Sequence, residues 1–258
     1  MKFVLLLICM IYLGAMAYLY FFQSSIVFNA SAIEPKEPFV LEDVKKVTLK
    51  TDADVVLDGV YKKSKYEQAP LMIYFGGNAD DATRFLLHVR NLEAYDIVSF
   101  NYRGYVNSTG KPSQEALFSD AKKIYDTYAK EKEVIVIGRS LGTGVATYLA
   151  TKREVKGVIL ITPYDSIASI AKKKYPIFPI DYLLKHKFES AKYIVNVKAP
   201  IGLIEVKDDS VVTKYHFDKL KENIQNLALH VSLSDTTHGE VLTHKDFEKS
   251  IKNIIERM

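Results

Sequence analysis

The sequence contains little that would support disulfide or zinc chemistry. It has a single cysteine, Cys9, which lies inside an apolar N-terminal run and cannot form an internal disulfide. No cluster of cysteines and histidines has the spacing of a zinc site, so structural zinc is not expected. No segment recurs at the period of a solenoid repeat. These absences argue against a disulfide-rich, zinc-stabilised or repeat protein.

A strong charge of one sign is also lacking. The 35 lysines and arginines are nearly balanced by 31 aspartates and glutamates, which gives a net charge of +4. The basic residues are spread along the chain, so a nucleic-acid partner is not expected. The 258 residues, 48% of them hydrophobic and 26% charged, suffice for one large α/β domain or two small ones.

What the sequence does contain begins with an uncharged run from Phe3 to beyond Phe22. Its roughly 20 residues are enough to cross a bilayer as a helix, and aromatic residues gather toward its far end. We predict a transmembrane signal anchor over residues 1–23 and a juxtamembrane connection over residues 24–40. A signal peptide cleaved at Ala15-Met16-Ala17 is the alternative, but the apolar run continues past that point. Lys2 on the N-terminal flank favours a catalytic domain on the non-cytoplasmic side.

The remaining residues, 41–258, alternate between strand and helix patterns. An antiparallel pair at 44–49 and 55–62 leads into the sheet. Repeated alternation after it predicts an α/β fold with a mostly parallel sheet and helices on both faces, whose ligands bind at the carboxyl ends of the strands. The further strands are expected at 71–75, 96–100, 134–137, 155–161, 201–206 and 227–233. The helices are expected at 83–92, from Ser113 as N-cap to 130, after 140, near 215–221 and at the C-terminus.

One connection, residues 163–199 between the sixth and seventh strands, is far longer than the usual turn of about 2–6 residues. It contains short helical pieces, three consecutive lysines at 172–174 and an apolar patch at 175–180. We interpret it as a small cap over the strand ends. An ordinary helix with an irregular flank is the alternative for its first half.

The strand at 134–137 ends in Gly138-Arg139-Ser140-Leu141-Gly142, which fits the G-x-S-x-G pattern of a nucleophile elbow. A cramped strand-to-helix turn tolerates only small residues two positions either side of the serine, so glycine suits both. The pattern is weak alone, but a buried strand before it and an amphipathic helix after it are its confirming context. The alternative is a packing turn with an incidental serine.

A serine nucleophile needs a histidine base, and the base needs an orienting carboxylate, in the chain order Ser, Asp/Glu, His. Of the late histidines, His230 lies within a strand, His216 lies in a polar helix and His244 could cap the last helix. His238 lies in the loop after the last strand, so we predict it as the base. The carboxylate should be Asp208 or Asp209, and spacing alone does not choose between them.

The developing oxyanion needs two N–H donors. The amide of Leu141, directly after the nucleophile, is one candidate, and the loop Gly77-Asn78-Ala79 after the first parallel strand should supply the other. A plain strand-end turn is the alternative for that loop.

Several motifs occur together and in matching order, and the chain resembles the membrane-anchored serine α/β-hydrolases, a group that includes protein depalmitoylases. These motifs are Phe75-Gly76-Gly77-Asn78-Ala79, Asn101-Tyr102-Arg103-Gly104-Tyr105, Ser108-Thr109-Gly110-Lys111-Pro112-Ser113, Gly138-Arg139-Ser140-Leu141-Gly142, Pro163-Tyr164-Asp165-Ser166, Asp208-Asp209-Ser210-Val211-Val212 and His238-Gly239.

The resemblance implies the α/β-hydrolase fold, Asp209 as the acid, Asn78 as the second oxyanion amide and a structural turn at Arg103. The chain departs from the family pattern at Gly76-Gly77, where His-Gly is usual, so side-chain support for that loop is in question.

The expected protein is a membrane-tethered serine hydrolase that cleaves an acyl ester or thioester through Ser140, His238 and Asp209. No cofactor or metal is required, and the apolar patch of the cap suggests a small-molecule or lipid-like acyl substrate. The alternatives are a serine peptidase on the same fold and a non-catalytic binding protein that kept the fold.

Overall fold

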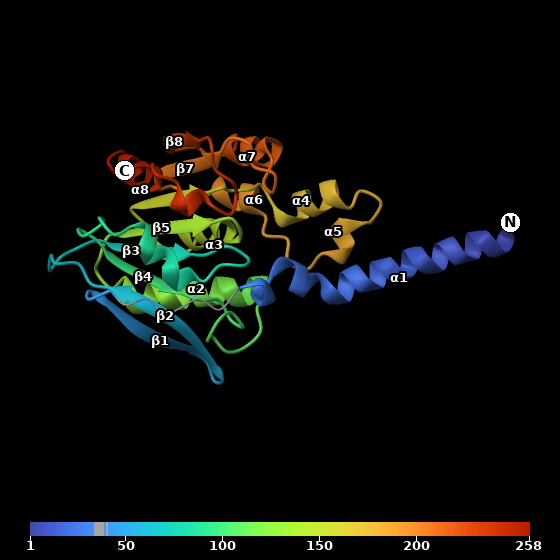
Figure 1. The fold of residues 1–258 in the computed structure, drawn as a ribbon, viewed down its shortest axis with the longest axis horizontal. Coiled ribbons are helices and arrows are strands. Elements are labelled where there is room, and N and C mark those ends of the chain that lie inside the picture. Colours follow the sequence, from blue (N-terminus) through green and yellow to red (C-terminus); the bar gives the residue numbers. More distant parts are fainter. Residues whose placement is uncertain (34–38, 40) are drawn as a thin grey trace.

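The computed structural model describes residues 1–33, 39 and 41–258. Its centre is an eight-stranded sheet in the order β1-β2-β4-β3-β5-β6-β7-β8 (Figure 1). The strands are β1 Val44–Asp52, β2 Val55–Lys62, β3 Leu71–Phe75, β4 Asp96–Phe100, β5 Val134–Arg139, β6 Gly157–Ile161, β7 Ile201–Val206 and β8 Leu227–Leu233. Strands β3 to β8 run parallel, whereas β1 and β2 pair antiparallel with each other and β2 pairs antiparallel with β4. The predicted mostly parallel sheet is confirmed.

Helices cover both faces of the sheet, as predicted, and each face carries its own apolar cluster. On one face lie α2 (Gln114–Tyr128), α3 (Leu141–Ala150) and α7 (Lys214–Lys221). The other face is covered by η2 (Ala82–His88) and α8 (Phe247–Ile255). Short 3₁₀ turns occur at η1 (Ala30–Ala32) and η3 (Val241–Thr243). The predicted cap of α2 is present, because the Ser113 hydroxyl accepts the amide of Ala116 at 3.1 Å.

The segment expected as a helix at 83–92 is instead the short 3₁₀ helix η2, which ends at His88. The Asp81 carboxylate accepts both the amide and the hydroxyl of Thr83, which fixes a tight first turn. Val89 and Leu92 are still buried, but they reach the core from a non-helical backbone. The apolar spacing therefore located the buried side chains correctly and the helix type wrongly.

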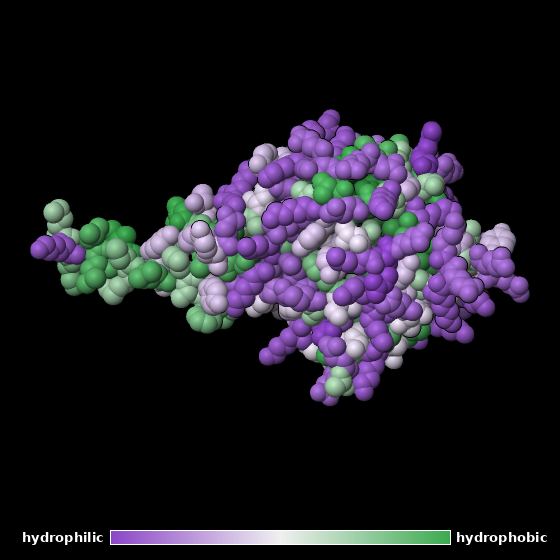
Figure 2. All heavy atoms as spheres, turned by 180° about the vertical axis from the view of Figure 1, so that it is seen from behind, coloured by the Kyte–Doolittle hydropathy of each residue, from purple (hydrophilic) through white to green (hydrophobic). Residues whose placement is uncertain are grey.

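The apolar N-terminal segment forms one helix, α1 (Lys2–Val27), which continues four residues past the predicted anchor of residues 1–23. It is long and apolar enough to cross a membrane, and its N-terminal part projects away from the domain (Figures 1 and 2). The predicted connection over 24–40 therefore begins as helix; its residues 34–38 and 40 lie outside the described residues.

The cap is built as predicted from short helices between β6 and β7. They are α4 (Ile167–Lys174), α5 (Ile180–Leu183) and α6 (Ser190–Ile194). Helix α6 packs back against α3, whereas α4 and α5 extend toward α1 beyond the carboxyl ends of the strands (Figure 1). The cap thus covers the edge at which a parallel sheet binds its ligands.

Candidate active site

Ser140 lies on a strained turn between β5 and α3. Its backbone has φ +47° and ψ −117°, a conformation that L-residues rarely adopt and that costs of order 1–3 kcal/mol. The flanking glycines are required by close backbone approach. A Cβ at Gly138 would lie 2.4 Å from the Gly142 carbonyl oxygen, and one at Gly142 would lie 2.1 Å from that of Phe75. The turn therefore lifts the Ser140 hydroxyl clear of the sheet.

The structure brings Ser140, His238 and Asp209 together from three separate loops. Nε2 of His238 lies 2.9 Å from the Ser140 hydroxyl, and Nδ1 of the same ring lies 2.7 Å from Oδ2 of Asp209. The serine and the carboxylate thus contact opposite nitrogens of the imidazole, so Nε2 can accept the serine proton while the carboxylate holds the Nδ1–H.

Asp209, and not its neighbour Asp208, reaches the histidine. Its other oxygen, Oδ1, accepts the amides of Val211 and Val212, both at 2.8 Å, which fixes the carboxylate in orientation. The Asp209 side chain is only 4% exposed, whereas Asp208 is an exposed residue. The short stretch after the acid therefore decides which of the two adjacent carboxylates faces the ring.

The two predicted oxyanion donors lie beside the serine. Leu141 is the first residue of α3, and neither its amide nor that of Asn78 has a hydrogen-bond acceptor among the described residues. A Cβ built at Gly77 would lie 3.7 Å from Cβ of Ser140, so the loop after β3 passes directly over the nucleophile. Two orphan N–H groups at the start of a helix and in an adjacent loop are suited to hold a developing negative charge.

Side-chain support for this loop, in question because Gly76-Gly77 replaces His-Gly, comes from elsewhere in the fold. Buried tyrosines of the 101–105 motif hold its carbonyls: Tyr102 donates to Gly76 at 2.9 Å and Tyr105 donates to Asn78 at 3.0 Å. The Arg103 guanidinium of the same motif pairs with Asp120 and Asp52, all at 2.6 Å, so it is structural, as the resemblance implies.

Arg139, the residue before the nucleophile, links the two loops of the site and was not foreseen from the sequence. Its guanidinium donates to the carbonyls of His238 and Gly239 at 3.0 and 2.9 Å, and to Asp80 at 3.1 Å. Asp80 in turn accepts the Gly77 amide at 3.3 Å. Burial disfavours the charged guanidinium, but the adjacent Asp80 carboxylate more than offsets this and raises the pKa of Arg139. The only signal in the sequence was a charged residue next to the serine.

The remaining late histidines have structural partners. His230 contacts Glu205 and Lys221 at 2.9 and 3.0 Å, and His244 accepts the amide of Asp246 at 3.1 Å just before α8.

A second Ser-His-Asp group joins α7 to the base of the cap. Nδ1 of His216 lies 2.8 Å from Asp165 and 3.4 Å from Ser169. Both contacts are made by the same nitrogen, and His216 is only 2% exposed, so this histidine cannot take a serine proton on one nitrogen while a carboxylate holds the N–H of the other. It provides a built-in control for tests of the first group.

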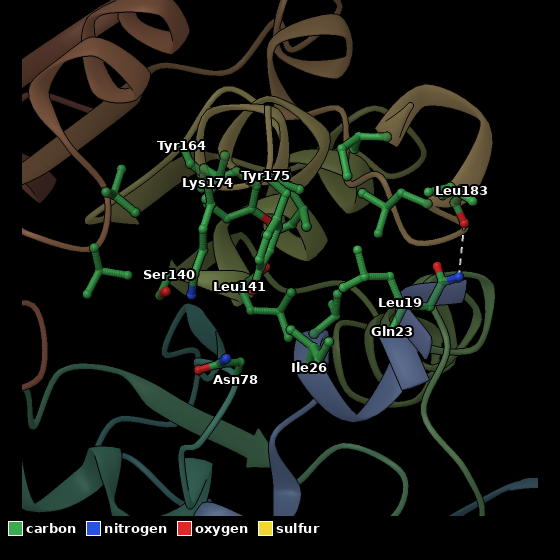
Figure 3. A pocket seen from close by; sticks show the side chains of 18 of the residues that line it. Leu19, Gln23, Ile26, Asn78, Ser140, Leu141, Tyr164, Lys174, Tyr175 and Leu183 are labelled. Carbon is green, nitrogen blue, oxygen red and sulfur yellow. Dashed lines mark hydrogen bonds between the residues drawn. The ribbon is translucent and has the colours of Figure 1, made fainter. Parts of the chain in front are cut away.

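Two cavities meet at Ser140, His238 and Asn78. The first, here the apolar chamber, has a volume of about 340 Å³ and lies between the cap and α1 (Figure 3). The second, here the polar chamber, has a volume of about 530 Å³ and lies between the oxyanion loop, η2 and the His238 loop. Apolar-chamber residues include Leu19, Gln23, Ile26, Ile167, Ile170, Tyr175, Ile180 and Leu183. Polar-chamber residues include Asp80, Asp81, Arg84, His88, Arg139 and Thr243. In the described part of the chain, no three His, Cys, Asp or Glu side chains come together as a metal site.

The arrangement of this sheet, with an antiparallel pair followed by parallel strands and a cap after β6, is that of an α/β hydrolase. Solved structures confirm the fold. An esterase of Pyrococcus furiosus matches with a TM-score of 0.62 and 18% identity over 83% of this chain and 92% of that chain. Est1E of Butyrivibrio proteoclasticus matches with a TM-score of 0.66 and 17% identity over 81% and 99%. The chain therefore has the α/β-hydrolase fold.

Several proteins are also similar to this chain in sequence. An uncharacterized protein of Mycobacterium tuberculosis is 27% identical over 221 residues, which cover 81% of this chain and 78% of that protein. The lysophosphatidylserine lipase ABHD12 of Xenopus tropicalis is 31% identical over 69% of this chain and 52% of its own length. Human ABHD12B is 30% identical over 64% and 53%. The matched region is thus about half of these animal proteins, and no family model matches the chain.

Proposed function

We propose that the chain is a membrane-tethered serine hydrolase that cleaves acyl esters or thioesters through Ser140, His238 and Asp209. The observation that carries the proposal is the continuous contact from serine to imidazole to carboxylate, at 2.9 and 2.7 Å. The backbone of the same serine is strained, with a positive φ. Two unpaired amides next to the same hydroxyl support it further.

In the proposed reaction, Oγ of Ser140 attacks the carbonyl carbon while Nε2 of His238 takes its proton. Asp209 holds the Nδ1–H of the imidazole and stabilises the imidazolium that forms. The amides of Leu141 and Asn78 stabilise the oxyanion, and each such donor is typically worth about 10²–10³ in rate. His238 then protonates the departing alcohol or thiol. A water molecule, activated by His238 in the same way, releases the acyl group from Ser140 as a carboxylic acid.

The two chambers suggest how a substrate divides at the nucleophile. The apolar chamber is of the size and lining that accept an acyl chain, and the polar chamber could hold a polar or charged leaving group. A lipid with one acyl chain and a polar headgroup has this shape. The related ABHD12 proteins are named as lysophosphatidylserine lipases, and we extend to this chain the broader class of single-chain lipid esters.

We further propose that α1 anchors the domain to a membrane by one pass. It is the helix long and apolar enough to span a bilayer in the described part of the chain. Lys2 at its start favours an N-terminus on the cytoplasmic side and a catalytic domain on the other.

Hydrolysis of p-nitrophenyl butyrate by the full-length chain tests the proposed chemistry. We expect Ser140→Ala to lower kcat by about 10⁴-fold or more, and Asp209→Asn by about 10⁴-fold. Ser169→Ala, in the second Ser-His-Asp group, should leave kcat unchanged, because its histidine uses one nitrogen for both partners. Equal activity in Ser140→Ala and wild-type protein would contradict the proposal.

A further inference from the structure

The cap carries exposed apolar side chains at its far end. This cap tip, residues 175–183, includes Ile177, which is 70% exposed, and Tyr182, which is 90% exposed. Three consecutive lysines at 172–174 precede it and Lys185 follows it. Exposed apolar residues flanked by lysines are the pattern of a segment that dips into a membrane surface while its lysines reach the headgroups.

Helix α1 lies against the cap along one face. Its partly or fully buried positions are 12, 15, 16, 19, 23, 24 and 27, which fall on one side of the helix because residues three and four apart share a face, whereas the opposite face is exposed. Gln23 holds this contact with a fully used amide: its nitrogen donates to Leu183 at 3.0 Å and its oxygen accepts the amide of Lys185 at 2.6 Å. Lys185 also lies 4.2 Å above the ring of Tyr20. These contacts hold helix α1 against the cap.

The contact continues toward the N-terminus of α1. The Tyr12 hydroxyl donates to the Ile177 carbonyl at 2.8 Å, and the Tyr12 ring stacks on Phe178 at 5.3 Å. Tyr12 precedes Tyr20 by eight residues, about 12 Å along a helix axis. If the aromatic residues near Tyr20 mark the membrane interface, Tyr12 and the cap tip lie within the bilayer.

Several polar groups of the cap tip have partners that suit that environment, and its one carboxylate, Asp181, pairs with Lys172 at 2.7 Å. In lipid, backbone polar groups need internal partners, because each unpaired group costs several kcal/mol. Pro176 and Pro179 have no N–H. The amides of Phe178 and Ile180 donate to Tyr175 and Phe178, at 3.1 and 2.8 Å. The Ile177 carbonyl is taken by Tyr12, whose hydroxyl would otherwise be an unpaired polar group among apolar residues.

The same face of α1 reaches the nucleophile through the apolar chamber. Leu19, Gln23 and Ile26 form one wall, the cap forms the other, and Ser140 lies at the inner end (Figure 3). An acyl chain that fills this chamber would therefore contact the anchor helix itself. With α1 in a bilayer, this cavity would open toward lipid.

We propose that α1 and the cap tip form a lipid-facing entrance, embedded in the bilayer, through which the acyl chain of a membrane lipid ester enters and along which it binds. This inference depends on the proposed function for its chemistry. It assigns to the anchor helix a second role as one wall of the acyl-binding site, with Leu19 and Ile26 as residues that set the preferred chain length.

Chain-length selectivity tests the acyl-binding role. In the full-length protein in detergent, Leu19→Trp should fill the apolar chamber and lower the ratio of kcat/KM for p-nitrophenyl palmitate to that for the butyrate. We expect about a tenfold fall, the equivalent of losing contact with about two methylene groups. Phe21→Trp, on the exposed face of the same helix, is the control and should keep the wild-type ratio. Because both esters are measured on one preparation, a loss of folded protein lowers both kcat/KM values equally and leaves their ratio unchanged. An unchanged ratio in Leu19→Trp overturns the acyl-binding role.

Membrane placement of the cap tip is tested without catalysis. The chain contains no tryptophan, so Ile177→Trp introduces a single fluorescent reporter. In phosphatidylcholine vesicles with brominated acyl chains, its fluorescence should be strongly quenched. Tyr66→Trp, between β2 and β3 at the opposite end of the sheet, should not be quenched. Equal fluorescence of the Ile177→Trp protein in brominated and ordinary vesicles would overturn the entrance. Absence of any ester hydrolysis by wild-type protein would instead refute the proposed function, and the quenching result would still decide where the cap tip lies.

Discussion

Replacing Arg139 by methionine removes the link between the oxyanion loop and the histidine loop. Methionine keeps most of the side-chain length but none of the three donations, to His238, Gly239 and Asp80 at 3.0, 2.9 and 3.1 Å. Asp80 then keeps the Tyr74 hydroxyl and the Gly77 amide as donors, at 2.9 and 3.3 Å. The substitution acts on both halves of the site without touching the nucleophile.

The expected loss follows from the exposure of the pair. Breaking a buried ion pair by removing one partner costs about 3–5 kcal/mol. The Arg139 and Asp80 side chains are 12% and 18% exposed, so we expect the lower end, about 3 kcal/mol of unfolding free energy. For catalysis, a displacement of about 1 Å in the base can cost about 10²-fold, and we expect kcat to fall by that order. The KM of a long-chain ester should change little, because Arg139 does not line the apolar chamber.

The assay combines ester hydrolysis, with kcat and KM separated, and urea unfolding. Arg153→Met is the matched control: Arg153 also forms a forked pair, with Asp126 at 2.6 and 2.7 Å, but the two side chains are 32% and 50% exposed. It should lose at most about 1 kcal/mol and no activity. Arg139→Lys keeps the charge but not the fork, so we expect it to recover little of kcat. A wild-type kcat in Arg139→Met, or full recovery with lysine, would refute the positioning role.

Three further predictions concern the loop, the turn and the cap. Tyr105→Phe frees the Asn78 carbonyl and should lower kcat about tenfold, less than the loss of a whole oxyanion donor; steady-state kinetics on a short ester with no change at all would argue against it. Gly142→Ala should give little soluble protein, since its Cβ would lie 2.1 Å from a backbone oxygen; expression with wild-type thermal stability would be inconsistent with the tight turn. Burial lowers the pKa of the His186 imidazole below 6.5, so the unfolded chain takes up the proton first. Stability should therefore be lost as the pH falls below the ordinary imidazole pKa of about 6.5, and thermal unfolding of His186→Gln should show a smaller loss.

The sequence predicted the fold, and it pointed to residues that the structure brings together in the candidate site, because those features depend on local patterns. Buried strands read as short apolar runs, and the elbow at Ser140 needs glycines at fixed offsets for steric reasons that the structure makes explicit. The position of His238 could be predicted from the topology of the sheet, because this residue follows the last strand. Parallel strands bring their carboxyl ends to one edge, so a loop there is near the serine whatever its other residues are.

Features that depend on distant partners could not be foreseen. Arg139 binds residues 59 and 99 positions away, and nothing near it in the sequence specifies them. The choice of Asp209 over Asp208 depends on two amides that turn back on the carboxylate, and only the family resemblance had favoured it. The contact of Tyr12 with Ile177, across 165 residues, depends on where the cap folds relative to α1. In each case the partner is set by tertiary packing and not by local propensity.

The proposed chemistry is tested most directly by covalent labelling of the full-length protein with a fluorophosphonate, followed by intact and peptide mass measurement. The proposal predicts one adduct per chain, on Ser140, and none in Ser140→Ala at equal folding. It also predicts much slower labelling in His238→Ala, since the hydroxyl then lacks its base at 2.9 Å. Wild-type protein that is folded yet unlabelled, or an adduct that persists in Ser140→Ala, would contradict it.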